Sequence, residues 1–269
     1  MRIMTERVEI SITDHIAVVT LNRPDKHNAV DVRMFEALAN AGNQLAEDRT
    51  VRAVVLEGAG ASFCAGVDLD IFRQSDSPIS NSAMSPGEST PANFFQRAAF
   101  VWREIPVPVI CAIHGIAYGA GLQIALGADL RYATADSRLS VMEIKWGIIP
   151  DMAISTTLPG LMATDKIKEL AWTGRIVQGE EACALGLITA VHENPSQVAR
   201  DTAQIIASKS PDAIRAIKTL FDKTEELTTE QALQLEARLQ LSLLGGPNQV
   251  EAVTANLEKR SPEFDDPQG

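Results

Sequence analysis

The alternation of apolar and polar residues at the start of the chain predicts two strands followed by a helix. Residues 8–12 alternate, residues 14–15 offer a turn, and residues 16–21 are mainly apolar, which is typical of a β-hairpin. Residues 22–28 then form a polar loop that contains a proline. We expect a helix of about 17 residues to begin at Asp31. Its apolar stripe would comprise Met34, Leu38 and Leu45.

Strands and helices are predicted to alternate through the middle of the chain. The predicted strands are apolar runs bounded by breaks in the pattern, at residues 51–56, 109–113, 129–132 and 139–144. The predicted helices cover residues 92–104 and 122–126, and a glycine-rich turn at residues 115–121 precedes the second helix. Alternation of this kind favours an α/β fold.

The segment from Ser75 to Pro91 has a different composition, rich in serine, proline, asparagine and glycine. We interpret it as a mobile surface insertion that could act as a lid.

After about residue 195 only helical patterns are found. The predicted helices are at residues 196–208, 211–223, 228–243 and 247–259. We therefore expect an α/β core over residues 1–195 and a helical region over residues 196–269. Such a helical region is expected to dock on a neighbouring subunit.

The composition of the 269 residues narrows the class of protein. Hydrophobic residues make up 45% and charged residues 22%, so the chain can bury a sizeable core. The chain lacks a run of 18 apolar residues, and its first ten residues lack the apolar segment of a signal peptide, so we expect no membrane span and a cytoplasmic location. The net charge of −11, without any long basic run, argues against nucleic-acid binding.

The three cysteines and four histidines are scattered along the chain and have no metal-ligand spacing. We therefore expect neither a metal nor a redox cofactor, and we interpret Cys64 as a packing residue rather than a nucleophile.

Two glycine-containing turns carry the first indication of chemistry, at residues 65–69 and 119–122. The start of a helix leaves backbone N–H groups unpaired, and small residues allow a ligand carbonyl to approach them closely. Two such N–H groups that converge on one oxygen would form an oxyanion hole. The alternative is that these glycines only make tight turns.

Four blocks of sequence resemble, in their order and spacing, the crotonase superfamily, also called the enoyl-CoA hydratase/isomerase family. The resemblance covers residues 7–260 or thereabouts. The blocks are Leu21-Asn-Arg-Pro-Asp-Lys-His-Asn-Ala29, Ser62-Phe-Cys-Ala-Gly-Val-Asp-Leu69, Ile113-His-Gly-Ile-Ala-Tyr-Gly-Ala-Gly121, and Gly174 with Glu180-Glu-Ala-Cys-Ala-Leu-Gly-Leu187.

This resemblance implies a core of repeated ββα units coiled into a spiral, and a C-terminal helical region that forms a homotrimer or a dimer of trimers. It implies an acyl-CoA substrate, so that coenzyme A enters as part of the substrate. It places the two N–H donors on Val67 and Ala120; the family usually has glycine at the second position, but alanine still supplies an N–H. The implied coenzyme A contacts are Lys26, Ala29, Ala65, Gly66, Asp68 and Leu69.

Two acid positions decide which reaction the resemblance implies. Family hydratases use two glutamates, which would fall at Gln123 and Glu143. Gln123 cannot exchange a proton and can only orient water or substrate by hydrogen bonding. Hydration requires an activated water and a proton for the α-carbon, whereas one carboxylate can move a double bond by removing a proton and returning it elsewhere. Glu143 alone is therefore similar to the acid of the Δ3,Δ2-enoyl-CoA isomerases.

Asp151 is a second candidate acid, within the segment Trp146-Gly-Ile-Ile-Pro-Asp-Met152. The pair Glu143 and Asp151 resembles that of the dienoyl-CoA isomerases, which carry a further aspartate at the Gln123 position. An aspartate at the Asp151 position is also similar to the nucleophile of 4-chlorobenzoyl-CoA dehalogenase, whose tryptophan and histidine neighbours are not evident here. The structural alternative is that Asp151 caps the helix expected after it.

We therefore predict a crotonase-fold enzyme that acts on unsaturated fatty acyl-CoA thioesters through an enolate, with double-bond isomerisation favoured. Two alternatives remain open. One is an enoyl-CoA hydratase that uses Glu143 and a water held by Gln123. The other is a non-catalytic acyl-CoA-binding protein.

Overall fold

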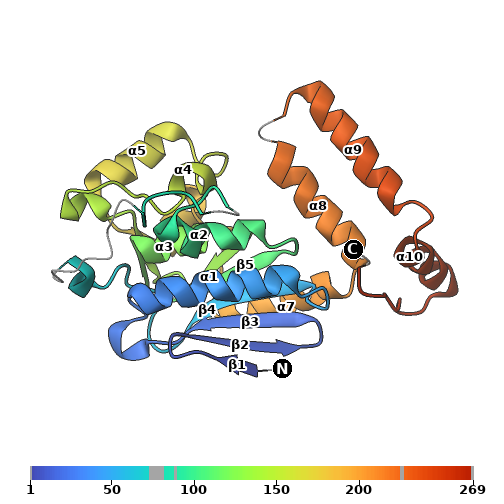
Figure 1. Cartoon of the computed structure of the whole chain (residues 1–269), viewed down its shortest axis with the longest axis horizontal. Helices are drawn as coiled ribbons and strands as arrows, with labels where there is room; N and C mark the ends of the chain where they lie inside the picture. Colours follow the sequence, from blue (N-terminus) through green and yellow to red (C-terminus); the bar gives the residue numbers. More distant parts are fainter. Residues whose placement is uncertain (1, 73–81, 88–89, 225–226, 268–269) are drawn as a thin grey trace.

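The predicted hairpin forms one side of the main sheet in the computed structural model, which describes residues 2–72, 82–87, 90–224 and 227–267 (Figure 1). Within these residues the sheet has seven strands in the order β1-β2-β3-β4-β5-β7-β10. The first three strands pair antiparallel, and all later pairs are parallel. The strands are β1 (Arg2–Met4), β2 (Val8–Thr13), β3 (Ile16–Leu21), β4 (Ala53–Gly58), β5 (Val109–Ile113), β7 (Leu130–Ala133) and β10 (Ala190–Val191).

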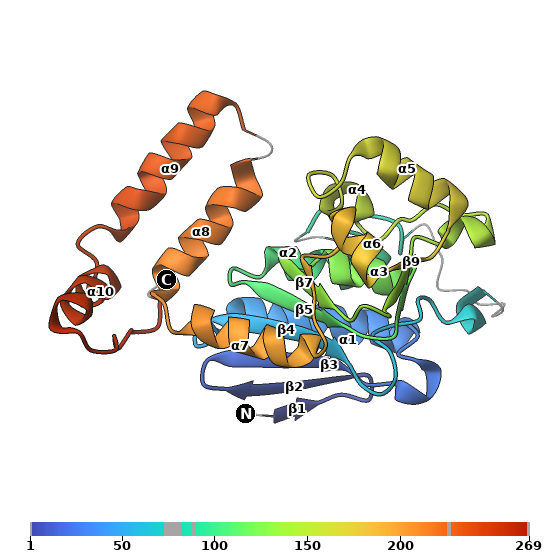
Figure 2. The ribbon, with the colours of Figure 1, turned by 180° about the vertical axis from the view of Figure 1, so that it is seen from behind.

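Helices cover both faces of this sheet, because its central strands are apolar on both sides. On one face lie α1 (Val32–Glu47) and α2 (Phe94–Glu104), and on the other lies α7 (Pro195–Ala207) (Figures 1 and 2). Side chains along β4 alternate between the two layers: Leu56 joins the larger core, whereas Val55 packs with Ala199 and Ala203 of α7. These observations confirm the α/β fold class.

A small second sheet adjoins the main one. It consists of β6 (Ile116–Tyr118), β8 (Arg138–Ser140) and β9 (Val177–Gln178), with β8 in the middle. The expectation of a plain turn over residues 115–121 is therefore wrong, since β6 lies inside it. The predicted strand at 139–144 is too long, because the chain leaves extended geometry at Met142 and forms the short 3₁₀ helix η3 (Glu143–Trp146).

Several short elements connect these layers. They are η1 (Pro24–Lys26), η2 (Leu69–Phe72), α3 (Ala120–Leu126), α4 (Ile154–Thr157), α5 (Thr164–Thr173) and α6 (Gly179–Ala184). Most of the Ser75–Pro91 segment, expected to be an insertion or lid, lies outside the described residues. No helix in the part of the chain that the structure describes is long and apolar enough to cross a membrane.

The last three helices project away from the sheet as a separate arm (Figures 1 and 2). They are α8 (Pro211–Thr224), α9 (Thr229–Leu243) and α10 (Pro247–Glu258). The division at residue 195 stays a prediction; α7 itself packs on the sheet through Ala199 and Ala203, so the arm begins after it.

Lys218 ties α8 to the core. Its side chain is almost fully buried, and its Nζ donates to the carbonyl oxygens of Trp102 and Val107 and to Asp129 Oδ2, at 3.5, 3.1 and 2.7 Å. A buried ammonium is tolerated only where its donors find acceptors, as they do here.

We expect Lys218→Met to lower the free energy of unfolding by about 2–3 kcal/mol, because it leaves Asp129 without its cation and two carbonyl groups without a donor. Denaturant unfolding measures this change. Lys223→Met, on an exposed position of the same helix, is the control and should change stability by less than about 0.5 kcal/mol. Equal stabilities of the two variants would contradict this role of Lys218.

Candidate active site

The first glycine turn is shaped by the loop that precedes it. Asn28 is fully buried in the left-handed conformation (φ 57°), and its Nδ2 donates to the carbonyl oxygens of Ala59, Ser62 and Phe63 at 2.9–3.0 Å. One amide therefore holds the loop that leaves β4, and it places the turn beginning at Ala65 against the second sheet.

The N–H of Val67 faces away from its own strand partner. Val67 forms an isolated parallel bridge with Val30, in which the Val30 N–H donates to Gly66 O and the Asp68 N–H donates to Val30 O. Both bonds skip Val67, so its N–H points to the opposite side, toward the cavity. Among the hydrogen bonds of the described residues, this N–H has no acceptor.

In the second turn, Ala120 is the first residue of α3. The backbone N–H of the first residue of a helix has no acceptor within the helix. Gly119 before it has φ +50°, which glycine adopts without strain. The two turns touch: a Cβ on Gly66 would lie 2.8 Å from Tyr118 O and 3.8 Å from the Ala120 nitrogen. The structure thus brings the N–H groups of Val67 and Ala120 to one place.

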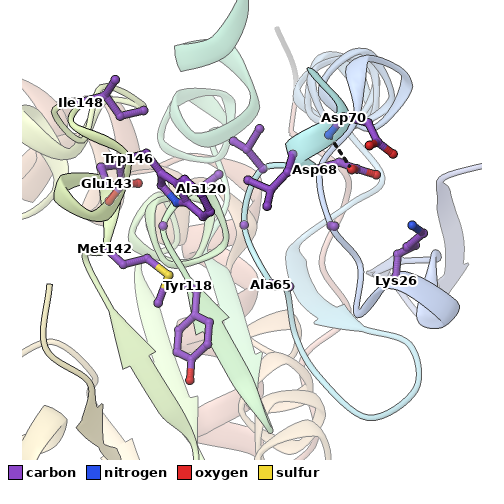
Figure 3. Close-up of a pocket in the computed structure, with 15 residues that line it drawn as sticks. Lys26, Ala65, Asp68, Asp70, Tyr118, Ala120, Met142, Glu143, Trp146 and Ile148 are labelled. Carbon is purple, nitrogen blue, oxygen red and sulfur yellow. Dashed lines mark hydrogen bonds between the residues drawn. The ribbon is translucent and has the colours of Figure 1, made fainter. Parts of the chain in front are cut away.

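A cavity of about 390 Å³ opens at this junction (Figure 3). Most of the predicted site residues line it, namely Lys26, Ala29, Ala65, Gly66, Val67, Asp68, Leu69, Ala120 and Glu143. Residues 21–29, 62–69, 113–121 and 143 are far apart in sequence, so their convergence is a result of the fold. Gln123 and Asp151 do not line the cavity.

Charged groups stand on one side of the cavity, where Figure 3 shows Lys26, Asp68 and Asp70. Asp68 accepts from the Arg23 guanidinium at 2.7 Å. Burial by itself would raise the pKa of Asp68, but the Asp70 N–H, the Arg23 guanidinium and the charge of Lys26 together hold it below its ordinary value. Lys26 is exposed and could meet an anionic group of a ligand.

Glu143 stands on the opposite side, at the start of η3 and 7% exposed. Its Oε1 accepts from Gln123 Nε2 at 2.5 Å, whereas its Oε2 is buried without a hydrogen-bond partner in the described part of the chain. Burial raises the pKa of the Glu143 carboxyl, and the charge of Asp151 adds to this rise. Hydrogen bonds from the Glu143 backbone N–H and from Gln123 oppose it. The result is a buried carboxyl with one oxygen held by Gln123 and the other without a hydrogen-bond partner among the described residues.

Asp151 is half-buried, and burial also raises the pKa of its carboxyl. Its charge raises the pKa of Glu143, so the two acids lie within electrostatic range of each other, although Asp151 is not part of the cavity wall. The alternative that Asp151 caps a helix is wrong. The following helix, α4, begins at Ile154, its cap residue is Ala153, and that cap has no side-chain hydrogen bond.

Gln123 lies behind Glu143 and is 1% exposed. Its Nε2 donates to Glu143, and its Oε1 accepts from the Met152 N–H at 2.8 Å. The sequence predicts that Gln123 orients water or substrate, but its amide is already engaged at both ends with protein groups.

Several cavity residues were not predicted from the sequence. Tyr118, Gly119, Met142, Trp146 and Ile148 also line the wall. Met142 and Trp146 lie close to Glu143 in sequence, and Gly119 precedes Ala120. The sequence could have identified them as cavity residues only because they lie near predicted site residues. Asp70 lines the wall as well.

Neither a metal site nor a reactive thiol is indicated by the described residues. They contain no group of three or more His, Cys, Asp or Glu residues that could hold a metal ion. Cys64 lies beneath the first turn, its Sγ donates to Asn28 O, and burial raises its pKa to about 12. A thiol with such a pKa stays protonated, in keeping with a packing role.

Comparisons with known proteins agree with this architecture. The family model described as Enoyl-CoA hydratase/isomerase matches residues 11–267, and the chain belongs to that family, the crotonase superfamily. The crystal structure of enoyl-CoA hydratase from Bacillus anthracis superposes with a TM-score of 0.88 at 28% identity, covering 97% of this chain and 100% of that one. The fold is therefore of the crotonase type.

Relatives with different activities are similar to this chain to the same degree. The peroxisomal Delta(3,5)-Delta(2,4)-dienoyl-CoA isomerase of Arabidopsis thaliana is 31% identical, with 91% of this chain and 90% of the relative covered. The 1,2-epoxyphenylacetyl-CoA isomerase of Escherichia coli (strain K12) is also 31% identical, with 97% and 99% covered.

The raised pKa of Glu143 predicts how stability depends on pH. A carboxyl whose pKa is higher in the folded state holds its proton more tightly there, so ionisation weakens the fold as the pH rises above the ordinary value of 4.5. We expect Glu143→Gln to raise the free energy of unfolding at about pH 8 and to leave it unchanged below about pH 4. Denaturant unfolding at both pH values tests this.

The matched control is Glu36→Gln, on the exposed face of α1. It should give the same difference between the two pH values as the unmodified protein. A Glu143→Gln variant that is less stable than the unmodified protein at the higher pH would contradict the burial argument.

Proposed function

We propose that this enzyme of the enoyl-CoA hydratase/isomerase family moves a double bond within an unsaturated acyl-CoA, with Glu143 as the proton carrier. The observation that carries the proposal is the set of groups around the cavity. One buried carboxylate borders it together with the N–H groups of Val67 and Ala120, which have no acceptor among the described residues, and the neighbouring position 123 holds an amide.

The thioester oxygen would accept from the N–H groups of Val67 and Ala120. Such donors stabilise the oxyanion that forms when a proton leaves the α-carbon. The Glu143 carboxylate would take this proton, the C–H electron pair would enter the enolate, and the same carboxyl would return the proton to the γ-carbon. The double bond thereby moves into conjugation with the carbonyl, and atoms and charge balance without a second reactant.

The raised pKa of Glu143 supports this role. A base is most effective when its pKa lies near the working pH, and burial moves Glu143 in that direction from the ordinary value of a glutamate. Hydration would need a further group to activate water or deliver a proton, and Gln123 cannot supply one. Asp151, beside Glu143, is the group that would extend the shift to a conjugated diene.

The coenzyme A portion would lie along the side of the cavity formed by Ala29 and the segment Ala65–Leu69, with Lys26 near its phosphates. The opposite rim is apolar, with Met142, Trp146 and Ile148, which suits an acyl chain.

We also propose that the arm of α8–α10 joins copies of the chain into a homotrimer or a dimer of trimers. Large apolar side chains on these helices are exposed in the single chain, and burying them would be favourable. They are Phe221, Leu233, Leu241, Val253 and Leu257.

We expect the protein to isomerise a 3-enoyl- or 3,5-dienoyl-CoA and to hydrate crotonyl-CoA poorly. Product formation is followed by absorbance and by mass, since hydration adds one water and isomerisation adds nothing. Glu143→Gln should lower the isomerisation rate by about 10²–10⁴-fold. Rapid loss of crotonyl-CoA absorbance without isomerisation would favour the hydratase alternative. If Glu143→Gln leaves the turnover of every acyl-CoA substrate unchanged while coenzyme A binding is retained, the binding-protein alternative is favoured.

The N–H of Ala120 can be removed with little disturbance, because proline is tolerated at the first position of a helix. We expect Ala120→Pro to lower kcat by about 10²–10³-fold, the usual effect of losing one oxyanion donor. Ala120→Gly keeps the N–H and should retain kcat within a few-fold. If both variants lose the same activity, the position matters for packing and the N–H is not a donor.

A further inference from the structure

Gln123 connects the two acids of the site through a single side-chain amide. The Nε2 end donates to Glu143 Oε1 at 2.5 Å, and the Oε1 end accepts from the N–H of Met152, the residue after Asp151, at 2.8 Å. Because both ends are engaged, the orientation of the amide is determined: its nitrogen must face the carboxylate and its oxygen must face the backbone N–H.

The other side of Glu143 Oε1 is closed by Gly119. A Cβ at Gly119 would lie 3.1 Å from this oxygen, and Gly119 itself has φ +50°. Oε1 is therefore held between the Gln123 amide and the Gly119 backbone. Oε2, in contrast, is buried without a hydrogen-bond partner among the described residues.

We propose that Gln123 is a positioning residue, a clamp that holds Oε1 and so fixes the Glu143 carboxyl relative to the Asp151–Met152 segment. The clamp rests on the proposed function, because it orients the carboxyl that would carry the proton in that reaction. It also defines a role for the amide at position 123 that differs from contact with water or substrate.

Few other charges bear on Glu143. From the segment after η3, Asp151 acts on it electrostatically. Lys26, Asp68 and Asp70 stand on the other side of the cavity (Figure 3), and α3, which carries Gln123, has no ionisable residue. Loss of the Gln123 donor should therefore be visible in the titration of Glu143.

Two variants separate the two ends of the clamp. Gln123→Met removes both the donor and the acceptor while keeping the length of the side chain. Gln123→Glu keeps an acceptor for the Met152 N–H but replaces the donor with a carboxyl that repels ionised Glu143. Ile124→Val, a buried neighbour on α3, is the matched control for a small loss of packing. Thermal unfolding establishes that each variant is folded.

The first measurement is the pH dependence of isomerisation. We expect both Gln123 variants to move the acidic limb of kcat/KM to higher pH, because the ionised carboxylate loses its donor. The kcat should fall by about 10–100-fold, the scale of a misplaced catalytic group. KM should change little, since Gln123 does not line the cavity. Ile124→Val should leave the acidic limb of the kcat/KM profile unchanged.

The second measurement does not require the reaction. Carbon-13 NMR of protein labelled at glutamate carboxyls, with the Glu143 signal assigned by Glu143→Gln, gives the titration midpoint of Glu143 directly. We expect this midpoint to rise in both Gln123 variants. If the isomerisation substrates are not turned over but the midpoint still rises, the proposed function fails and the clamp stands. If the midpoint is unchanged in Gln123→Glu and in Gln123→Met, the clamp is overturned.

Discussion

The contact between two glycine turns is the constraint on which the site depends. A Cβ on Gly66 would lie 2.8 Å from the Tyr118 carbonyl oxygen, and a Cβ on Gly119 would lie 3.1 Å from the Glu143 carboxyl. Both glycines have positive φ, a conformation that other residues adopt with strain. Because these backbones approach without side chains between them, the N–H groups of Val67 and Ala120 border the same cavity as Glu143.

The electrostatics of the cavity follow from how each wall is buried. Asp68 lies beside Arg23 and near Lys26, so its charged form is favoured. Burial of Glu143 disfavours its charged form, and this effect outweighs the hydrogen bonds that its own backbone N–H and Gln123 donate to the carboxylate. The cavity thus has one wall suited to the polar portion of a ligand and another that holds a poised carboxyl. This asymmetry is what the proposed proton transfer requires.

The sheet and the arm have different reasons for their stability. The central strands are covered on both faces, by α1 and α2 and by α7, so the site rests on a dry and rigid layer. The arm of α8–α10 contacts this layer through few elements, and the buried Lys218 is one of its anchors. Several large apolar side chains of the arm are exposed in the single chain.

The sequence by itself determined most of the longer strands and helices and the positions of the glycine turns. Periodicity predicted β2, β3, β5, α1, α2 and the four C-terminal helices, because each has a local apolar pattern matched to its own geometry. Ordered blocks such as residues 62–69 and 113–121 indicated the family, and they identified most of the residues that line the cavity. The short β6 and the 3₁₀ helix at Glu143 were missed, since three or four residues are too few to show a period, and α5 and α6 were not predicted either.

Only the tertiary structure decided how the acids are arranged. Sequence position placed Gln123 among the candidate site residues, but the fold buries it behind Glu143, where both ends of its amide are engaged. It likewise excluded Asp151 as a helix cap and set it beside Glu143. These outcomes depend on which groups are brought within hydrogen-bonding distance across 20–29 residues of chain, and on how much water is excluded around them. Neither quantity is a property of a local segment, so no pattern along the chain could have revealed it.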